Sequence, residues 1–268
     1  INTPRIGYTG KNKKEFYQKL DQLMELAKDS LETKRKLVES LTDKGLYPYT
    51  KVYLEAIKMR RNQYWANHFS TIGLIGMNEA LLNFLGKDIT TKEGQKFAEE
   101  VLSHMRDKMV KFQKETDNMY NLEASPGEGT GTRLALLDKK KYPDMFFAND
   151  KAVKESEATP YYTNSSQLPV YFTEDIFEAL DLQENLQTKY TGGTVLHGFL
   201  GERIMDIETT KNLVRKIAEN YSLPYFTLTP TFSICPVHGY LNGEHAVCPK
   251  CVAEQSSVTY IKVKFEEQ

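Results

Sequence analysis

Three cysteines and one histidine near the end of the chain have the spacing of metal ligands. The stretch SICPVHGYLNGEHAVCPKC contains Cys235-x-x-His238 followed by Cys248-x-x-Cys251. A two-residue spacing lets both members of a pair face one ion from a tight turn. Three thiolates and one imidazole make a closed tetrahedral Zn²⁺ site. Because a closed site keeps no position for water, we expect this zinc to be structural.

Two other interpretations of this stretch stay open. His245 lies in the same segment and could replace His238 as the fourth ligand, with a less regular spacing. The three cysteines, which are all that the chain has, could also be free thiols in a turn. Their arrangement in two pairs favours metal binding over this second alternative.

A glycine pair lies in the segment YTGGTVLHGFLGE. Gly192 and Gly193 carry no side chain, so backbone N–H groups can approach an anion there. A helix beginning after Thr194 would add its dipole to such a site. An ordinary turn is the alternative for a lone glycine pair. Glu123, in NLEASPGEGTGTR, follows a predicted strand, which is where parallel α/β folds place their sites, and it is either a site residue or a surface residue.

Composition excludes several classes of protein. The 268 residues are 40% apolar and 26% charged, as in ordinary globular proteins, and can bury a sizeable core. A net charge of −1 provides no basic field for nucleic acid or an anionic membrane. The apolar runs are far too short to span a bilayer, and no signal peptide is visible. Clustered cysteines indicate a reducing compartment, so we expect a cytoplasmic protein.

Long helices alternate with short apolar strands along the chain. This alternation predicts an α/β architecture with a largely parallel sheet, either open or part of a barrel. Helices are predicted from helical periodicity and from caps such as Asn12, and strands from short apolar runs. The predicted helices are 12–44, about 50–67, 77–86, 92–117, one entered from the loop at 127, 173–190 and 206–222, and the predicted strands are 69–76, 119–126, 159–170, 224–235 and a strand end at 1–8.

Six motifs, in order, resemble the anaerobic (class III) ribonucleoside-triphosphate reductases. They are INTPRIGY, STIGLIGMNE, NLEASPGEGTGTR, YYTNSSQLPV, YTGGTVLHGFLGE and TPTFSICPVHGYLNGEHAVCPKC. The resemblance covers roughly residues 1–251 and is to the C-terminal half of the catalytic subunit. It implies a ten-stranded α/β barrel made of two halves. Residues 1–230 would form the second half, and residues 231–268 a zinc-binding module and a C-terminal tail.

The resemblance also implies a chemistry and partners. In this family a separate iron–sulfur, S-adenosylmethionine-dependent activase generates a glycyl radical, which oxidises a cysteine inside the barrel. The resulting thiyl radical reduces ribonucleoside triphosphates to deoxyribonucleoside triphosphates for DNA replication, with formate or a thiol system as reductant. The complete enzyme is expected to be a homo-oligomer, a dimer, that binds neither nucleic acid nor membrane.

By the same resemblance, specific residues of this chain acquire roles. Glu123 would line the substrate pocket. Asn2 is a weaker candidate, at the strand end where formate-using members place a polar active-site residue. The residues implied for the substrate phosphates are Gly192, Gly193, Thr194 and Val195.

Two parts of the family's radical machinery have no counterpart in this sequence. The radical cysteine should precede INTPRIGY, and the glycyl-radical segment should follow the zinc site, where the last glycine is Gly243. We therefore expect a fragment, or one chain of a split reductase, that is inactive alone and is completed by an upstream half. The alternatives are a non-catalytic zinc-bearing scaffold or binding protein derived from the same fold, and a relative of the formate lyases.

Overall fold

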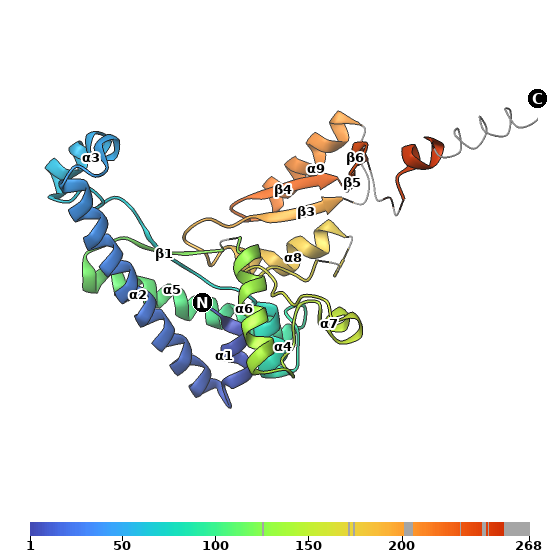
Figure 1. The fold of residues 1–268 in the computed structure, drawn as a ribbon, viewed down its shortest axis with the longest axis horizontal. Helices are drawn as coiled ribbons and strands as arrows, with labels where there is room; N and C mark the ends of the chain where they lie inside the picture. The colour runs from blue at the N-terminus through green and yellow to red at the C-terminus, as the bar shows by residue number, and fades with distance from the viewer. Residues whose placement is uncertain are drawn as a thin grey trace, which may run out of the picture. The chain divides into compact units, whose positions relative to one another are not determined.

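The chain divides into two compact units, which are described separately. The computed structural model describes residues 1–124, 126–170, 172–173, 175–200, 206–230, 232–242, 245 and 247–254 (Figure 1). The first unit comprises Ile1–Phe172 and Asp181–Val195, and the second comprises Thr173–Leu180 and Leu196–Gln268. This division by packing differs from the boundary at residue 230, which stays a prediction for the zinc-binding module. The predicted tail after residue 254 lies outside the described residues.

Helices and short strands alternate in both units, which confirms the α/β class. The first unit contains α1 (Thr3–Thr9), α2 (Lys13–Asp43), α3 (Pro48–Arg61), β1 (Ser70–Gly73), α4 (Met77–Leu85), α5 (Lys92–Thr116), β2 (Tyr120–Glu123), α6 (Glu128–Lys141) and α7 (Asp150–Ser156). Next come α8 (Ile176–Gln187), β3 (Leu196–Leu200), α9 (Ile207–Asn220), β4 (Phe226–Pro230), β5 (Phe232–Cys235) and β6 (Gly239–Asn242).

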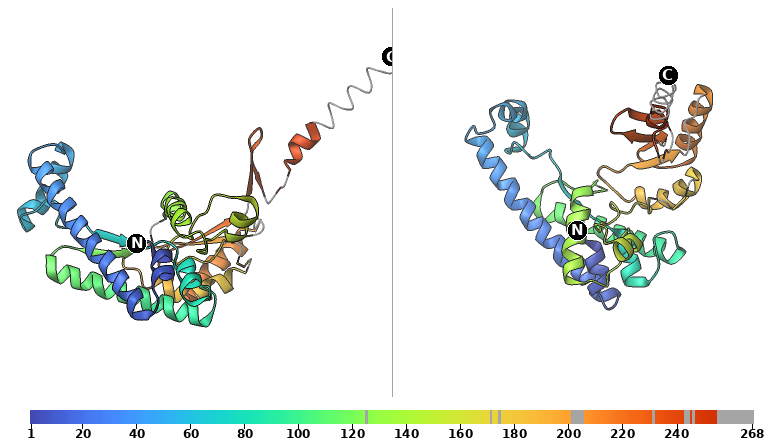
Figure 2. Two further views of the ribbon diagram at one scale, coloured as in Figure 1. Left: turned by 60° about the horizontal axis from the view of Figure 1, so that its bottom comes forward. Right: turned by 45° about the vertical axis from the view of Figure 1, so that its right-hand side comes forward.

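The long helices begin at the caps that the sequence predicts. The Asn12 side chain accepts a hydrogen bond from the Glu15 N–H at 3.0 Å, which satisfies a free donor at the start of α2. Thr91 caps α5 in the same way through the Gly94 N–H. α2 runs as one long rod from α1 to α3 (Figures 1 and 2).

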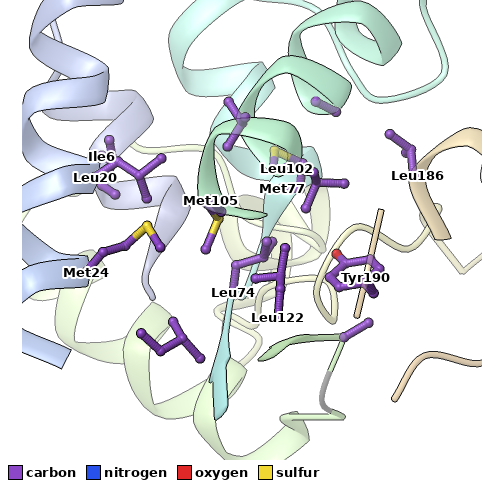
Figure 3. Packing of buried hydrophobic residues seen from close by; sticks show 14 of the residues in the cluster. Ile6, Leu20, Met24, Leu74, Met77, Leu102, Met105, Leu122, Leu186 and Tyr190 are labelled. Carbon is purple, nitrogen blue, oxygen red and sulfur yellow. The ribbon is translucent and has the colours of Figure 1, made fainter. Parts of the chain in front are cut away.

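The core of the first unit lies between these helices and one face of the β1–β2 pair. The two strands are parallel, with Ser70 opposite Tyr120 and Gly73 opposite Glu123. Leu74, Met77, Met105 and Leu122 come from different elements and meet in this core (Figure 3). The fully buried side chains include Phe16, Leu20, Met24, Leu102, Met109 and Phe112.

The two faces of the β1–β2 pair differ in character. Side chains alternate between faces along a strand. Ile72 and Leu122 are therefore on the core face, and Thr71, Asn121 and Glu123 are on the other face with Gly73. Helices cover the apolar face, whereas the second face carries the polar side chains at the carboxyl end of the sheet. A functional site in this unit is expected on that second face.

The second unit repeats the parallel strand–helix–strand arrangement. β3 and β4 are parallel, with Leu196 opposite Phe226, and α9 connects them along the chain. Leu196, Leu180 and Ile217 are buried together on one side of the pair. The alternate β3 residues His197 and Phe199 are exposed. β5 and β6 form a separate antiparallel hairpin.

The structure differs from several of the predictions of local structure. Residues 1–8 are not the end of a strand: only Asn2 makes a bridge, to Ile75, and α1 begins directly after it. Residues 159–170 are not a strand, apart from a bridge of Asn164 with Ile75. Tertiary hydrogen bonds hold that segment instead. The backbone N–H and the hydroxyl of Thr163 both donate to the buried carboxylate of Glu79. The helix α7 was not predicted, and the helix expected at about 50–67 ends at Arg61, because Asn62 adopts the left-handed conformation.

Among the described residues, no helix combines the length and the apolar character that crossing a bilayer requires. The long helices α2 and α5 each carry a charged face, and ion pairs such as Lys28–Glu115 and Lys108–Glu25 join them. This pattern is typical of helices that bury one stripe and leave the other in water.

The packing of α5 against β2 generates a test of the core. Phe112 is fully buried, and its ring centroid lies 5.7 Å from that of Tyr120. Phe112→Ala should lower the free energy of unfolding by about 3–5 kcal/mol, because it leaves a cavity between helix and sheet. Val110→Ala, at an exposed position of the same helix, should change it by less than about 0.5 kcal/mol. Denaturant unfolding of both variants measures the difference, and equal effects would contradict this placement of the core.

Candidate functional site

The four predicted metal ligands are brought together by the β5–β6 hairpin and a following helical turn. Cys235 ends β5 and is paired with Gly239 at the start of β6, so His238 lies in the connecting turn. Gly239 has φ +69°, a conformation that glycine adopts without strain. The Val252 N–H donates to the Cys248 carbonyl, which closes a helical turn between the last two cysteines.

The ligand atoms have the separations of a tetrahedral metal site. His238 Nδ1 lies 3.8, 3.5 and 3.3 Å from the sulfurs of Cys235, Cys248 and Cys251, and Cys235 Sγ lies 3.6 Å from Cys251 Sγ. All four atoms are within 4.8 Å of one another. Tetrahedral Zn²⁺ with ordinary Zn–S and Zn–N bonds separates its ligand atoms by about 3.5–3.8 Å. The four separations given for the individual atom pairs, 3.3–3.8 Å, are close to this range, so the donor set suits a zinc ion.

Neighbouring groups lower the pKa of the Cys235 thiol and raise the pKa values of Cys251 and His238. Backbone N–H groups of His238 and Val237 point at the Cys235 sulfur and lower the pKa of this thiol to about 6. The thiolate is the form that binds metal. His238 Nε2 lies 2.8 Å from Glu254 Oε1, and this contact raises the pKa of His238 to about 9, so a metal ion that binds Nδ1 has to displace a proton from the ring. A carboxylate on the outer nitrogen is the usual arrangement for a metal-binding histidine, because it fixes the ring orientation.

His245, the alternative fourth ligand, is outside this cluster. It is exposed, and its backbone N–H donates to the Ser233 hydroxyl. The group of metal-binding side chains found in the described part of the chain contains His238 and not His245.

The predicted substrate residues Glu123 and the glycine loop 190–195 lie together in the first unit. The N–H groups of Thr191 and Gly192 both donate to the Leu122 carbonyl, at 3.0 and 2.8 Å. The Ala124 N–H donates to the Gly193 carbonyl at 2.9 Å. These backbone hydrogen bonds hold the loop against the carboxyl end of β2, beside the Glu123 side chain.

The two glycines of this loop are not equivalent. A Cβ atom on Gly192 would lie 2.8 Å from Asn121 Nδ2 and 3.2 Å from the Glu123 Cβ, which is too close. A Cβ atom on Gly193 would lie 3.6 Å from the nearest Glu123 atoms, which is an ordinary contact. Close packing therefore requires glycine at 192, whereas the space at 193 admits a small side chain.

The donors that the loop offers are fewer than the sequence predicts. The Gly192 N–H is already bonded to Leu122, whereas those of Gly193, Thr194 and Val195 donate no hydrogen bond within the described part of the chain. The Thr194 hydroxyl is buried and donates to Gln187. No helix begins after Thr194, since strand β3 starts at Leu196. The predicted contribution of a helix dipole is therefore absent. The free N–H groups are what this loop offers to an anion.

Asn2 has a structural position. Its side-chain oxygen caps α1 by accepting from the Arg5 N–H, and its side-chain nitrogen donates to Asp138 at 2.8 Å. Asp138 is fully buried and also binds the Arg5 side chain and the Tyr162 hydroxyl. Both polar ends of Asn2 are thus used within the fold, and this side chain serves the packing of α1.

Asn121 is a residue of this site that the sequence interpretation missed. It precedes Glu123 by two positions on β2, so strand alternation places both on one face. The signal was available in the sequence as the period of two in NLE. Its burial next to Gly192, however, depends on a loop about 70 residues further along the chain.

The fold and the cluster define an α/β chain with parallel strand–helix–strand units and a Cys₃His metal-binding knuckle. A family model described as anaerobic ribonucleoside-triphosphate reductase matches residues 1–262. The chain belongs to the anaerobic ribonucleoside-triphosphate reductase family.

Similar proteins share this fold along nearly the whole chain. The anaerobic ribonucleoside-triphosphate reductase of Haemophilus influenzae is 25% identical over 271 residues, which cover 94% of this chain and 36% of that protein. The Thermotoga maritima anaerobic ribonucleotide reductase with MES in the active site has a TM-score of 0.69 and 25% identity, over 92% of this chain and 39% of that one. The same enzyme with dATP bound in the specificity site has a TM-score of 0.67, 25% identity, and covers 94% and 39%. This chain spans little more than a third of the length of these relatives.

The difference in space around Gly192 and Gly193 allows a test of the loop's packing. Gly192→Ala should lower the free energy of unfolding by about 1–3 kcal/mol, because the added methyl group meets the buried Asn121 side chain. Gly193→Ala should change it by less than about 0.5 kcal/mol, since its methyl group finds ordinary contacts. Chemical denaturation of the matched pair measures this, and a larger loss for Gly193→Ala would show that the loop packs differently on β2.

Proposed function

We propose that this chain is part of an anaerobic ribonucleotide reductase, which reduces ribonucleoside triphosphates to deoxyribonucleoside triphosphates by glycyl and thiyl radical chemistry. The observation that carries the proposal is the family match over residues 1–262, which includes both the glycine loop and the metal cluster. The likeness in fold to the Thermotoga maritima enzyme supports it.

The chain's first role in this enzyme is to supply half of an α/β barrel. Two parallel pairs, β1–β2 and β3–β4, support this proposal. Each pair has one face packed on apolar side chains and a second face that carries polar or exposed ones. A strand pair with one face on apolar side chains and a second, more polar or exposed face matches the wall of a barrel, in which helices cover the outside and functional side chains line the inside.

The second role is to bind the substrate's phosphates and sugar. The N–H groups of Gly193, Thr194 and Val195 are free donors, which suit phosphate oxygens. The Glu123 carboxylate lies beside the same loop and repels phosphate, so the phosphates would bind on the side of the N–H groups. Glu123 would then face the sugar, whose hydroxyl groups donate to a carboxylate.

The third role belongs to zinc, held by Cys235, His238, Cys248 and Cys251. The bound ion supplies a structural cross-link between the β5–β6 hairpin and the following helical turn. All three cysteines of the chain belong to this cluster, so with zinc bound none of them would be left to carry a thiyl radical. The radical cysteine is proposed to lie on an upstream half of the reductase and the radical glycine on a further segment, activated by an iron–sulfur, S-adenosylmethionine-dependent activase. A dimeric complete enzyme and a cytoplasmic setting remain part of this proposal.

Metal analysis tests the cluster. The chain purified without chelator should contain about one zinc ion, and His238→Ala should lose it, because the tetrahedral set is left with three ligands. His245→Ala is the matched control, since this exposed histidine is outside the cluster and should leave the zinc content unchanged. Loss of zinc should also unfold the hairpin, as binding of a structural zinc contributes on the order of 10 kcal/mol in peptides. Well under one zinc in the unaltered chain, or equal loss in both variants, would contradict the site.

Anaerobic turnover tests the function. The complete reductase with activase should show a glycyl-radical doublet in electron paramagnetic resonance and should produce deoxyribonucleotides. Gly193→Val should raise KM about tenfold or more, because a β-branched side chain blocks the close approach of phosphate to the backbone. Val110→Ala, on α5, should leave KM unchanged. Residues 1–268 by themselves should show no turnover.

Three results would overturn this proposal. Turnover by residues 1–268 alone would show that its cysteines serve the chemistry. An unchanged KM for Gly193→Val would remove the loop from the substrate site. A zinc-containing protein without radical or turnover in the presence of partner and activase would favour the scaffold alternative.

A further inference from the structure

Asn121 has an unpaired amide at the proposed substrate site. The residue is 8% exposed, and its Oδ1 atom is fully buried with no hydrogen-bond partner among the described residues. It is opposite Thr71 of β1 in the sheet register and lies against Gly192 of the loop. A buried amide oxygen without a donor costs about 1–3 kcal/mol relative to a paired one. This cost indicates that the amide is there for a group from outside the fold.

The neighbours of Asn121 restrict what that group is. Glu123, two residues further along the strand, is on the same face and adds a carboxylate acceptor. The loop beside Glu123 contributes the free N–H donors of Gly193, Thr194 and Val195. The site therefore has an acceptor-rich end at Asn121 and Glu123, and a donor-rich end at the loop.

A ligand that matches both ends has hydroxyl groups at one end and an anion at the other. Phosphate oxygens only accept hydrogen bonds near neutral pH, so they suit the N–H groups and not Glu123. A sugar hydroxyl both donates and accepts, so it pairs with a carboxylate and with either end of a neutral amide. Phosphorylated ribose has both groups a few bonds apart.

We propose that Asn121 is a substrate-binding residue whose amide hydrogen-bonds a ribose hydroxyl of the nucleotide, next to Glu123. The inference rests on the proposed function and adds to it the residue that recognises the sugar. Gly192 contributes to this binding site, because a side chain at this position would clash with the Asn121 amide. A site built to bond a hydroxyl rejects an analogue that lacks it, since the buried polar group is then left unpaired.

Asn121→Leu tests this role, because leucine has a similar volume and no polar atom. The complete enzyme is used without activase, so that nucleotide binds and no reduction follows. Equilibrium binding is measured for a ribonucleoside triphosphate and for its 2′-deoxy and 3′-deoxy analogues. The variant should bind the ribonucleotide about 10–100-fold more weakly, in line with the loss of one buried hydrogen bond. It should bind at least one deoxy analogue as the unaltered enzyme does, so that discrimination between the two sugars falls.

Stability gives the second readout. Asn121→Leu should leave the free energy of unfolding unchanged or higher, because it removes a polar group that has no partner in the fold. A structural asparagine would show the opposite, with a loss of stability and no selective loss of ribonucleotide.

The outcomes separate this inference from the proposed function. If the unaltered enzyme binds no nucleotide, the proposed function fails and the inference fails with it. If Gly193→Val weakens nucleotide binding whereas Asn121→Leu keeps full discrimination between ribose and deoxyribose, the loop assignment stands and Asn121 does not bind the sugar. Equal weakening of ribonucleotide and both deoxy analogues by Asn121→Leu would also overturn the role in sugar recognition.

Discussion

Parallel pairing of β1 with β2 constrains the rest of the first unit. Parallel strands cannot be joined by a tight turn, so the chain crosses over through α4 and α5 before it returns. The apolar stripe of α5 then covers one face of the pair, and burial of Phe112, Met105 and Leu122 stabilises that contact. The second face, and the carboxyl ends of both strands, are left for polar side chains. Glu123 and Asn121 occupy that face for this reason.

The glycine loop depends on the same pairing. The Leu122 carbonyl accepts a hydrogen bond from the Gly192 N–H, and the Ala124 N–H donates one to the Gly193 carbonyl. These two bonds hold the loop at the end of β2. A short loop fixed by backbone hydrogen bonds has little freedom to adjust. Its remaining N–H groups donate no hydrogen bond within the described part of the chain. Carboxylate, amide and free N–H groups thus come together from segments that are distant in the sequence, which is how a site with an acceptor end and a donor end arises.

The second unit is built around a different local constraint. A β-hairpin and one helical turn place three sulfurs and one imidazole at tetrahedral spacing, and the Glu254 carboxylate holds the outer nitrogen of His238. Most of this geometry comes from short turns, with Gly239 in the left-handed conformation where the hairpin turn enters β6. A metal ion in this cluster stabilises a segment that contributes only a few apolar side chains of its own, such as Leu241.

Local features were determined by the sequence alone. Caps and helical periodicity predicted α2 and α5 within a residue or two, and ligand spacing predicted a cluster whose members are separated by at most 16 residues. Such features depend on neighbours along the chain, so they can be predicted without knowledge of the fold.

Tertiary structure decided the rest. The strand predicted at 159–170 is absent because long-range hydrogen bonds with Glu79 and Gly76 fix that segment, and INTPRIGY forms a helix because its Asn2 and Pro4 begin one. The difference between Gly192 and Gly193, and the unpaired amide of Asn121, arise where β2 meets a loop about 70 residues away, because steric room and hydrogen-bond partners are properties of the packed chain.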